Sequence, residues 1–225
     1  MKVTDAMTKT VATIAPDSSL KQAAELFDQH GIGGAPVVDS DGHVIGVITD
    51  TDIVLKERGE VPQTGWLQSL RHSDASEAVA AKVEARTVAD AMSAPAITAS
   101  ARWSVADVAD VMIEHGVNRL PVVEDDRLVG IITRHDLVRA FARGDSEIER
   151  DIRDEALRGL ALPEQIAIEV HDGAVTLRGE VESAYDAEAV PRMVRRVPGV
   201  VAVDSELAAW DGEKRQKVIV TARQP

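Results

Sequence analysis

Residues 46–52 read Gly-Val-Ile-Thr-Asp-Thr-Asp, and residues 130–136 repeat the pattern as Gly-Ile-Ile-Thr-Arg-His-Asp. Each copy holds a glycine, two β-branched residues, a threonine and, three residues after that threonine, an aspartate. The apolar run is typical of the end of a buried strand. The threonine stands where a helix would begin. We therefore expect a strand followed directly by a helix at both places.

The repeat extends well beyond these two stretches. Val-Thr-Asp-Ala-Met-Thr at residues 3–8 corresponds to Val-Ala-Asp-Ala-Met-Ser at residues 88–93, an offset of 92 − 7 = 85. The His-Gly pair at 30–31 and the Pro-Val-Val run at 36–38 recur at the same offset. A turn that is one residue shorter then gives an offset of 130 − 46 = 84. This regularity indicates two tandem copies of one structural unit.

Each copy predicts the element order β-α-β-β-α. In the first copy we expect an extended piece over residues 11–14, then a helix capped by Asp17 or Ser18. Two strands and a short helix starting at Thr49 follow. One such unit has too few elements to bury both faces of its sheet. We therefore expect the two copies, residues 1–58 and 87–145, to pack as a pseudo-twofold pair.

Three other segments complete the chain. Residues 59–86 interrupt the repeat and predict a connecting helix, or a helix that docks a partner through Trp66. Residues 146–212 predict a small α-β-β-α-β domain, with a hairpin turn at Asp172-Gly173. Its second helix is predicted over residues 184–197, where Pro191 is a local conflict that is more easily met if the helix starts or kinks there. The tail, residues 213–225, carries mixed charge and has no predicted element. The fold class is therefore α/β (α+β), with one paired module and one small domain.

Composition limits the classes of function. The 225 residues carry a formal net charge of −13, which argues against a nucleic-acid binder and an anionic membrane surface as partners. There is no cysteine, so disulfides, cysteine metal sites and thiol nucleophiles are excluded. No apolar run is long enough to span a membrane. We expect a soluble, cytoplasmic protein.

The two repeats resemble CBS (cystathionine-β-synthase-type) domains. The residues that carry the resemblance are the Asp-Ala-Met motifs, the Pro-Val-Val runs and the two Gly-x-x-Thr-x-x-Asp stretches. The segment His-Asp-Gly-Ala-Val-Thr-Leu-Arg-Gly at residues 171–179, followed by Val-Pro-Gly-Val-Val at 197–201, resembles a BON domain.

The resemblance implies two clefts that take an adenosine nucleotide such as AMP, ADP or ATP. Asp52 and Asp136 would accept the ribose hydroxyls, and Thr49 and Thr133 would place hydroxyls near the ribose or α-phosphate. The adenine would lie against Ala12, Ile32 and Gly34 in the first cleft, and against Ile97, Val117 and Asn118 in the second.

The two clefts are not expected to be equal. The second repeat offers Arg119, Arg134 and His135 to the first cleft, so that cleft is predicted to hold phosphate. The second cleft would face Asp50, which repels phosphate, and is predicted to bind more weakly. Two alternatives stay open: Thr-x-x-Asp also forms a helix capping box, and Arg134 and His135 also suit a solvated helical turn.

No catalytic motif or metal-ligand spacing occurs in the sequence, so we expect a protein that is not an enzyme and requires no cofactor. We predict a regulatory sensor that binds an adenine nucleotide, forms a homodimer through the CBS pair and acts on a partner through the BON domain. The alternative is a ligand-free dimerisation scaffold. Its BON domain would attach to a protein or, through the basic cluster at Arg192, Arg195 and Arg196, to phospholipid.

Overall fold

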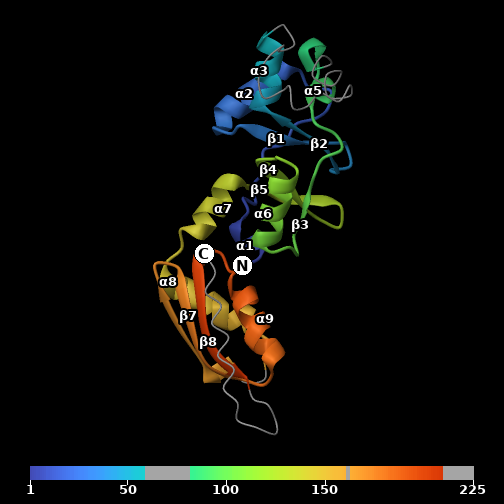
Figure 1. Cartoon of the computed structure of the whole chain (residues 1–225). Helices are drawn as coiled ribbons and strands as arrows, with labels where there is room; N and C mark the ends of the chain where they lie inside the picture. The colour runs from blue at the N-terminus through green and yellow to red at the C-terminus, as the bar shows by residue number, and fades with distance from the viewer. Residues whose placement is uncertain (59–81, 161–162, 210–225) are drawn as a thin grey trace. The chain divides into compact units, whose positions relative to one another are not determined.

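The computed structural model describes residues 1–58, 82–160 and 163–209 (Figure 1). The chain forms two compact units, which we describe one at a time. One unit comprises residues 7–101 and 119–132, and the other comprises residues 1–6, 102–118 and the chain from residue 133 onward. Most of the predicted connecting helix, including Trp66, lies outside the described residues, and so does the tail.

The first repeat contributes two helices and a hairpin to the first of these units. They are α2 (Leu20–His30), β1 (Gly34–Val38), β2 (Val44–Thr49) and α3 (Asp50–Arg58). Helix α2 begins at a capping box in which Ser19 and Gln22 bond each other, so the predicted caps Asp17 and Ser18 were wrong. The reason is local, because the side chain of Gln22, three residues after Ser19, accepts a hydrogen bond from the Ser19 backbone N–H.

The second repeat contributes α5 (Val88–Ala91) and a three-stranded sheet to the same unit. The strands are β3 (Ala99–Ser100), β4 (Arg119–Glu124) and β5 (Arg127–Thr133), in the order β3-β4-β5. Strand β3 runs parallel to β4. Its counterpart in the first repeat, predicted over residues 11–14, is reduced to a single parallel bridge between Ile14 and Val37. The predicted strand-helix junctions at Thr49 and Thr133 are confirmed.

Reciprocal contacts join the two repeats within this unit. Thr8 exchanges two backbone hydrogen bonds of 2.9 Å with Ile131, and Ser93 exchanges bonds of 2.9 and 3.0 Å with Val47. The methionines of the two Asp-Ala-Met motifs follow the same rule. A Cβ atom added at Gly130 would collide with the Met7 side chain, and one added at Gly46 would collide with the Met92 side chain. The methionine of each motif thus packs on a strand of the opposite repeat, Met7 on β5 and Met92 on β2.

The other unit holds the remaining helices of the repeats and the small C-terminal domain. The repeat helices are α1 (Val3–Ala6), α6 (Val105–Glu114) and α7 (Arg134–Phe141). The C-terminal elements are α8 (Asp145–Asp151), a π-helix (Ile152–Ala156), a 3-10 turn (Pro163–Gln165), β6 (Ile166–His171), β7 (Ala174–Val181), α9 (Ala184–Val194) and β8 (Ala202–Ala209).

The C-terminal domain has the predicted α-β-β-α-β order. Strand β7 is central, antiparallel to β6 and parallel to β8, and α8 and α9 cover one face of the sheet (Figure 1). The alternating inward residues of the strands pack against Ile152, Leu157 and Val190 of the helices. Helix α9 begins after the Ser183 cap at Ala184, where the sequence predicts it to begin, and it continues through Pro191 rather than starting there.

Among the described residues, no helix combines the length and apolar character needed to cross a membrane.

Candidate functional site

Thr49 and Asp52 form a short hydrogen-bonded pair where β2 meets α3. The backbone N–H and the hydroxyl of Thr49 both donate to Asp52 Oδ2, each at 2.8 Å. Asp52 is only 4% exposed, although it is charged. The bond from the Thr49 N–H to the Asp52 carboxylate is one half of the capping box that the sequence left open as an alternative. It engages one carboxylate oxygen and leaves the other, Oδ1, for a different partner.

That partner is a lysine that the sequence did not single out. Lys82 Nζ lies 2.5 Å from Asp52 Oδ1 and also donates to Ser93 Oγ at 3.1 Å. A buried carboxylate with a cationic partner is far less costly than an unpaired one. No motif marks Lys82, because it stands thirty residues from Asp52 in a segment without a repeat.

The second copy has the same arrangement in the other unit. The N–H and hydroxyl of Thr133 donate to Asp136 Oδ2 at 2.8 and 2.7 Å. Here the cation on Oδ1 is Arg139, at 2.6 Å, three residues along the same helix. Both predicted ribose acceptors therefore carry a chain cation, one from a distant segment and one from the adjacent helical turn.

Arg119, at the start of β4, lies near the start of α3. Its guanidinium lies against Gly33 and Gly34, since a Cβ added at Gly33 would be 3.1 Å from Nη2. Arg119 forms no ion pair or hydrogen bond with any other residue that the structure describes. Burial lowers the pKa of its guanidinium, while the nearby charges of Asp50 and Asp52 act in the opposite direction. A half-buried cation without a direct partner stands beside the helix start.

Asp50 lies on the same side as Arg119. A Cβ added at Gly33 would be 2.8 Å from Asp50 Oδ2, and the N–H of Asp50 donates to Gly33 O at 3.1 Å. Asp50 is the first residue of α3, and this backbone bond holds it beside Gly33, where its charge opposes the lowering of the Arg119 pKa by burial. The role expected for Asp50 at the second cleft stays a prediction.

The remaining predicted site residues are divided between the two units. Ala12 and Ile32 share the unit of Thr49 and Asp52, and Ile32 packs against the buried core there. Ile97 also belongs to that unit, but Val117, Asn118, Thr133 and Asp136 belong to the other. Arg134 and His135 are exposed in the first turn of α7 in the second unit, so their role at the first cleft stays a prediction.

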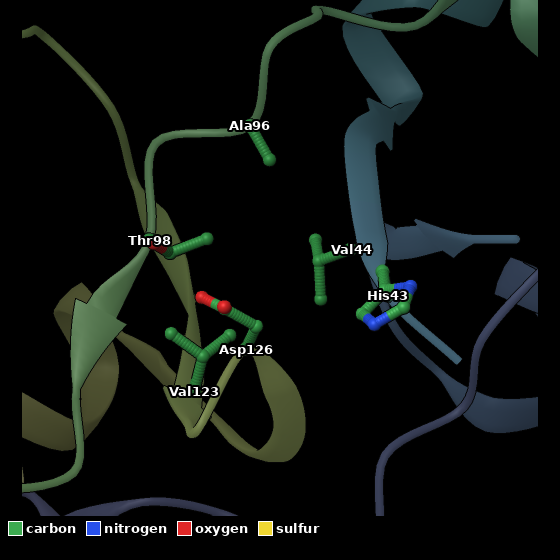
Figure 2. Close-up of a pocket in the computed structure, with 6 residues that line it drawn as sticks. All are labelled: His43, Val44, Ala96, Thr98, Val123 and Asp126. Atoms are coloured by element: carbon green, nitrogen blue, oxygen red, sulfur yellow. The ribbon is translucent and has the colours of Figure 1, made fainter. Parts of the chain in front are cut away.

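A separate pocket of about 440 Å³ opens at the opposite end of the β1–β2 hairpin. Gly34 pairs with Thr49 at one end of that hairpin and Val38 pairs with Val44 at the other. Figure 2 shows the side chains of His43 and Val44 facing those of Thr98 and Asp126 across the pocket. The lining is His43, Val44, Ala96, Thr98, Val123 and Asp126. The predicted ribose acceptor Asp52 does not contribute to this pocket.

The turn beside this pocket gathers three potential metal ligands. Oxygen or nitrogen atoms of Asp39, Asp41 and His43 lie within 4.8 Å of one another, on the surface. Asp39 Oδ1 accepts the N–H groups of Asp41 and His43, both at 2.9 Å. The bond from the His43 N–H lowers the pKa of Asp39. The turn geometry alone accounts for this cluster.

The basic cluster of the C-terminal domain is partly neutralised. Arg196 Nη2 lies 2.7 Å from Asp107 Oδ1 and 4.0 Å from Asp110 Oδ2. Arg192 and Arg195 are exposed. The cluster thus offers fewer unpaired charges to an anionic surface than the sequence alone suggested.

Comparison with known proteins places these features in a family. Residues 3–58 and 88–143 match the CBS domain, and residues 144–209 match the BON domain. The CBS domain-containing protein YhcV of Bacillus subtilis (strain 168) is 32% identical over 137 residues, 60% of this chain and 81% of YhcV. The uncharacterized protein MJ1404 of Methanocaldococcus jannaschii is 34% identical over 143 residues, which are 63% of this chain but only 32% of that protein.

A solved structure agrees in fold with the CBS part. The crystal structure of CBSX2 in complex with AMP is 26% identical, with a TM-score of 0.53, and the match covers 62% of this chain and 94% of that one. The CBS match rests on the paired repeats, and the BON match rests on the sheet and helices that follow them. The chain therefore belongs to the family of CBS domain-containing proteins, with a BON domain after its two CBS domains.

Proposed function

We propose that this protein is a regulatory module that binds an adenosine nucleotide in its first CBS cleft and transmits occupancy to a partner through its BON domain. The observation that carries the proposal is the position of Arg119 near the start of α3. Its half-buried guanidinium lies beside Gly33 and Gly34 and has no direct partner among the described residues, and the charge of Asp52 opposes the lowering of its pKa by burial. One cleft therefore offers a phosphate-binding cation and a diol-binding carboxylate.

Each residue has a role in this proposal. Asp52 accepts the ribose hydroxyls, and Thr49 orients the carboxylate through its two hydrogen bonds. Ala12, Ile32 and Gly34 border the adenine. Arg119 binds the phosphate, and the N–H groups at the start of α3 add to the attraction. The complex of CBSX2 with AMP supports this ligand class.

The charge of Asp50 limits how much phosphate the first cleft can hold. Because its carboxylate lies beside Gly33 near Arg119, it offsets part of the positive charge there. We expect AMP to bind more tightly than ATP. The second cleft is the weaker site, because the first repeat has Gly34 at the position that corresponds to Arg119 and so offers no cation there.

Calorimetric titration of the nucleotide-free protein with AMP tests this function. We expect one site per chain. Arg119→Ala should weaken AMP binding at least about tenfold, since hydrogen bonds between charged groups contribute roughly 1.5–3 kcal/mol, and should leave adenosine binding nearly unchanged. Arg127→Ala is the matched control, because Arg127 is an exposed arginine at the far end of the β4–β5 hairpin. Equal AMP affinity in the Arg119→Ala and wild-type proteins contradicts the phosphate role.

The module acts by binding rather than by catalysis. The sequence offers no nucleophile, acid-base couple or phosphate loop to which a reaction could be assigned. A ligand alters such a protein only by binding one conformation more tightly than another. Regulation by an adenine nucleotide therefore requires a contact in the cleft that ligand binding changes.

A homodimer through the CBS pair is part of the proposal. Val54 on α3 and Val138 on α7 occupy equivalent positions of the two repeats, since 138 − 54 = 84. They are 59% and 64% exposed, which is unusual for two aliphatic side chains at the same repeat position. Light scattering after size exclusion should give twice the chain mass, and Val54→Lys combined with Val138→Lys should give the monomer mass.

The partner of the BON domain is proposed to be a protein. The ion pair between Arg196 and Asp107 leaves the basic cluster poorly suited to phospholipid. Co-sedimentation with vesicles that contain 30% anionic lipid at low salt decides between the two: we expect the protein to stay in the supernatant. Sedimentation with these vesicles, abolished by Arg192→Glu with Arg195→Glu, would favour the scaffold attached to lipid.

A further inference from the structure

Lys82 occupies the carboxylate that the proposed ligand needs. Its ammonium lies 2.5 Å from Asp52 Oδ1, while Thr49 binds Oδ2 through its N–H and its hydroxyl. The Lys82 side chain is only 19% exposed, so the pair is shielded from water. Oδ2 already accepts two hydrogen bonds from Thr49, so two ribose hydroxyls would need both acceptor positions of Oδ1. Lys82 occupies one of these positions, so the lysine and the ribose compete for Oδ1.

Lys82 belongs to a short stretch, residues 82–86, that makes two hydrogen-bonded contacts with α3. Lys56 donates from Nζ to the backbone oxygen of Val83 at 2.6 Å, and Lys82 reaches back to Asp52. Asp52 and Lys56 are four residues apart, so both contacts lie on one face of α3. Val83 and Ala85 are buried beneath these contacts. Residues 82–86 lead directly to the cap of α5 at Thr87.

Loss of the contact at Asp52 would remove one of the two polar contacts described here between this stretch and α3. Its ordered backbone bonds include the one from Ala85 N to Lys82 O, at 3.3 Å. The stretch connects the insertion between the repeats to the second CBS domain. It is therefore placed to carry a change at the cleft into another part of the chain.

We propose that Lys82 is an intramolecular competitor for the ribose at Asp52, and that a nucleoside bound in the first cleft displaces its ammonium and loosens residues 82–86. This inference rests on the proposed function, because it takes the first cleft as the ligand site. Lys82 thereby lowers the affinity of the first cleft for a nucleoside, and its displacement marks the cleft as occupied. The motif residues of the two repeats do not include it.

Titration with adenosine, which has no phosphate for Lys82 to attract, tests the competition. Lys82→Met keeps the length of the apolar stem and removes the charge. We expect this variant of the full-length protein to bind adenosine about tenfold more tightly than the wild type, because no charged hydrogen bond has to be broken. Lys56→Met is the control: it removes the neighbouring contact but leaves the pair at Asp52, and should change the affinity less than threefold. An equal or weaker adenosine affinity in Lys82→Met overturns the inference.

Hydrogen exchange of the wild-type protein tests the displacement without any substitution. With saturating AMP, the amides in a peptide covering residues 82–88 should exchange at least threefold faster, led by Ala85. Unchanged or slower exchange with AMP bound overturns the inference, since Lys82 then stays in place. If neither the wild-type nor the Lys82→Met protein binds AMP or adenosine, the proposed function itself is wrong. If both bind them with equal affinity, only the role of Lys82 is wrong.

Discussion

Ser205→Ala is expected to stabilise the BON domain, although it removes a polar group from a natural core. Ser205 is 3% exposed and points inward from β8 between Val203 and Leu207. It pairs in register with Leu177 of β7, and its hydroxyl has no hydrogen-bond partner among the described residues. A buried hydroxyl without a partner costs about 1–3 kcal/mol. The alanine leaves a void of roughly 10 Å³, which costs only about 0.2 kcal/mol. A net gain of about 1 kcal/mol follows.

Native-state hydrogen exchange of the full chain measures this gain at the domain itself. A gain of about 1 kcal/mol should slow the exchange of the β8 amides, residues 202–209, roughly fivefold. Ser205→Cys, which has a similar volume and is less polar, should act in the same direction. Faster exchange in Ser205→Ala would refute the reasoning and would mean that the hydroxyl is hydrogen-bonded in solution, for example to a buried water molecule.

Three further predictions follow from other contacts. Gly46→Ala should destabilise the CBS pair by about 1–3 kcal/mol and more than Gly130→Ala, as measured by urea unfolding. The Cβ added at Gly46 meets the Ser93 carbonyl at 3.1 Å in addition to Met92, whereas the three atoms nearest to a Cβ at Gly130 all belong to the flexible Met7 side chain. Asp107→Asn should reduce the loss of unfolding free energy at acid pH, as measured by denaturant unfolding at a series of pH values. The Ser104 hydroxyl and then the Ser104 N–H lower the pKa of Asp107 below 3.8. The carboxylate therefore contributes stability above pH 3.8, and this contribution is lost as the pH falls through the pKa of the folded state. Asp145→Ala should speed exchange at Asp172 and Gly173, whose N–H groups donate to its carboxylate at 2.9 and 3.0 Å.

The features that the sequence could predict are those with a regular period or a local rule. The constant offset between the repeats was enough to locate the strand-helix junctions at Thr49 and Thr133. Asp172 and Gly173 adopt the positive φ angles, 48° and 75°, that a tight hairpin turn requires. Alternating apolar residues identified β6 and β7 in the same way. Each of these signals either spans only a few residues or recurs at a fixed offset along the sequence.

The features that the sequence could not predict depend on contacts between distant residues. Lys82 stands in a segment with no repeat and no motif, and only the fold brings it to Asp52. The position of Asp50 beside Arg119 likewise requires β4 and α3 to meet at Gly33. The cap at Ser19 is different, because its partner Gln22 is local and the capping-box rule would have selected it. At that position the sequence alone is enough to predict the helix cap.

Capping and ligand binding need not exclude each other at the Thr-x-x-Asp motif. A carboxylate has two oxygens, and in both repeats the threonine engages Oδ2 alone. What differs is the cation on Oδ1. In the second repeat Arg139 is three residues away on the same helix, so its displacement would disturb only one exposed side chain. In the first repeat the cation is Lys82, and its displacement would free a segment thirty residues distant. The two sites therefore share one motif but differ in the cation on Oδ1, and we expect ligand binding to affect a distant segment at the first site and a neighbouring helical turn at the second.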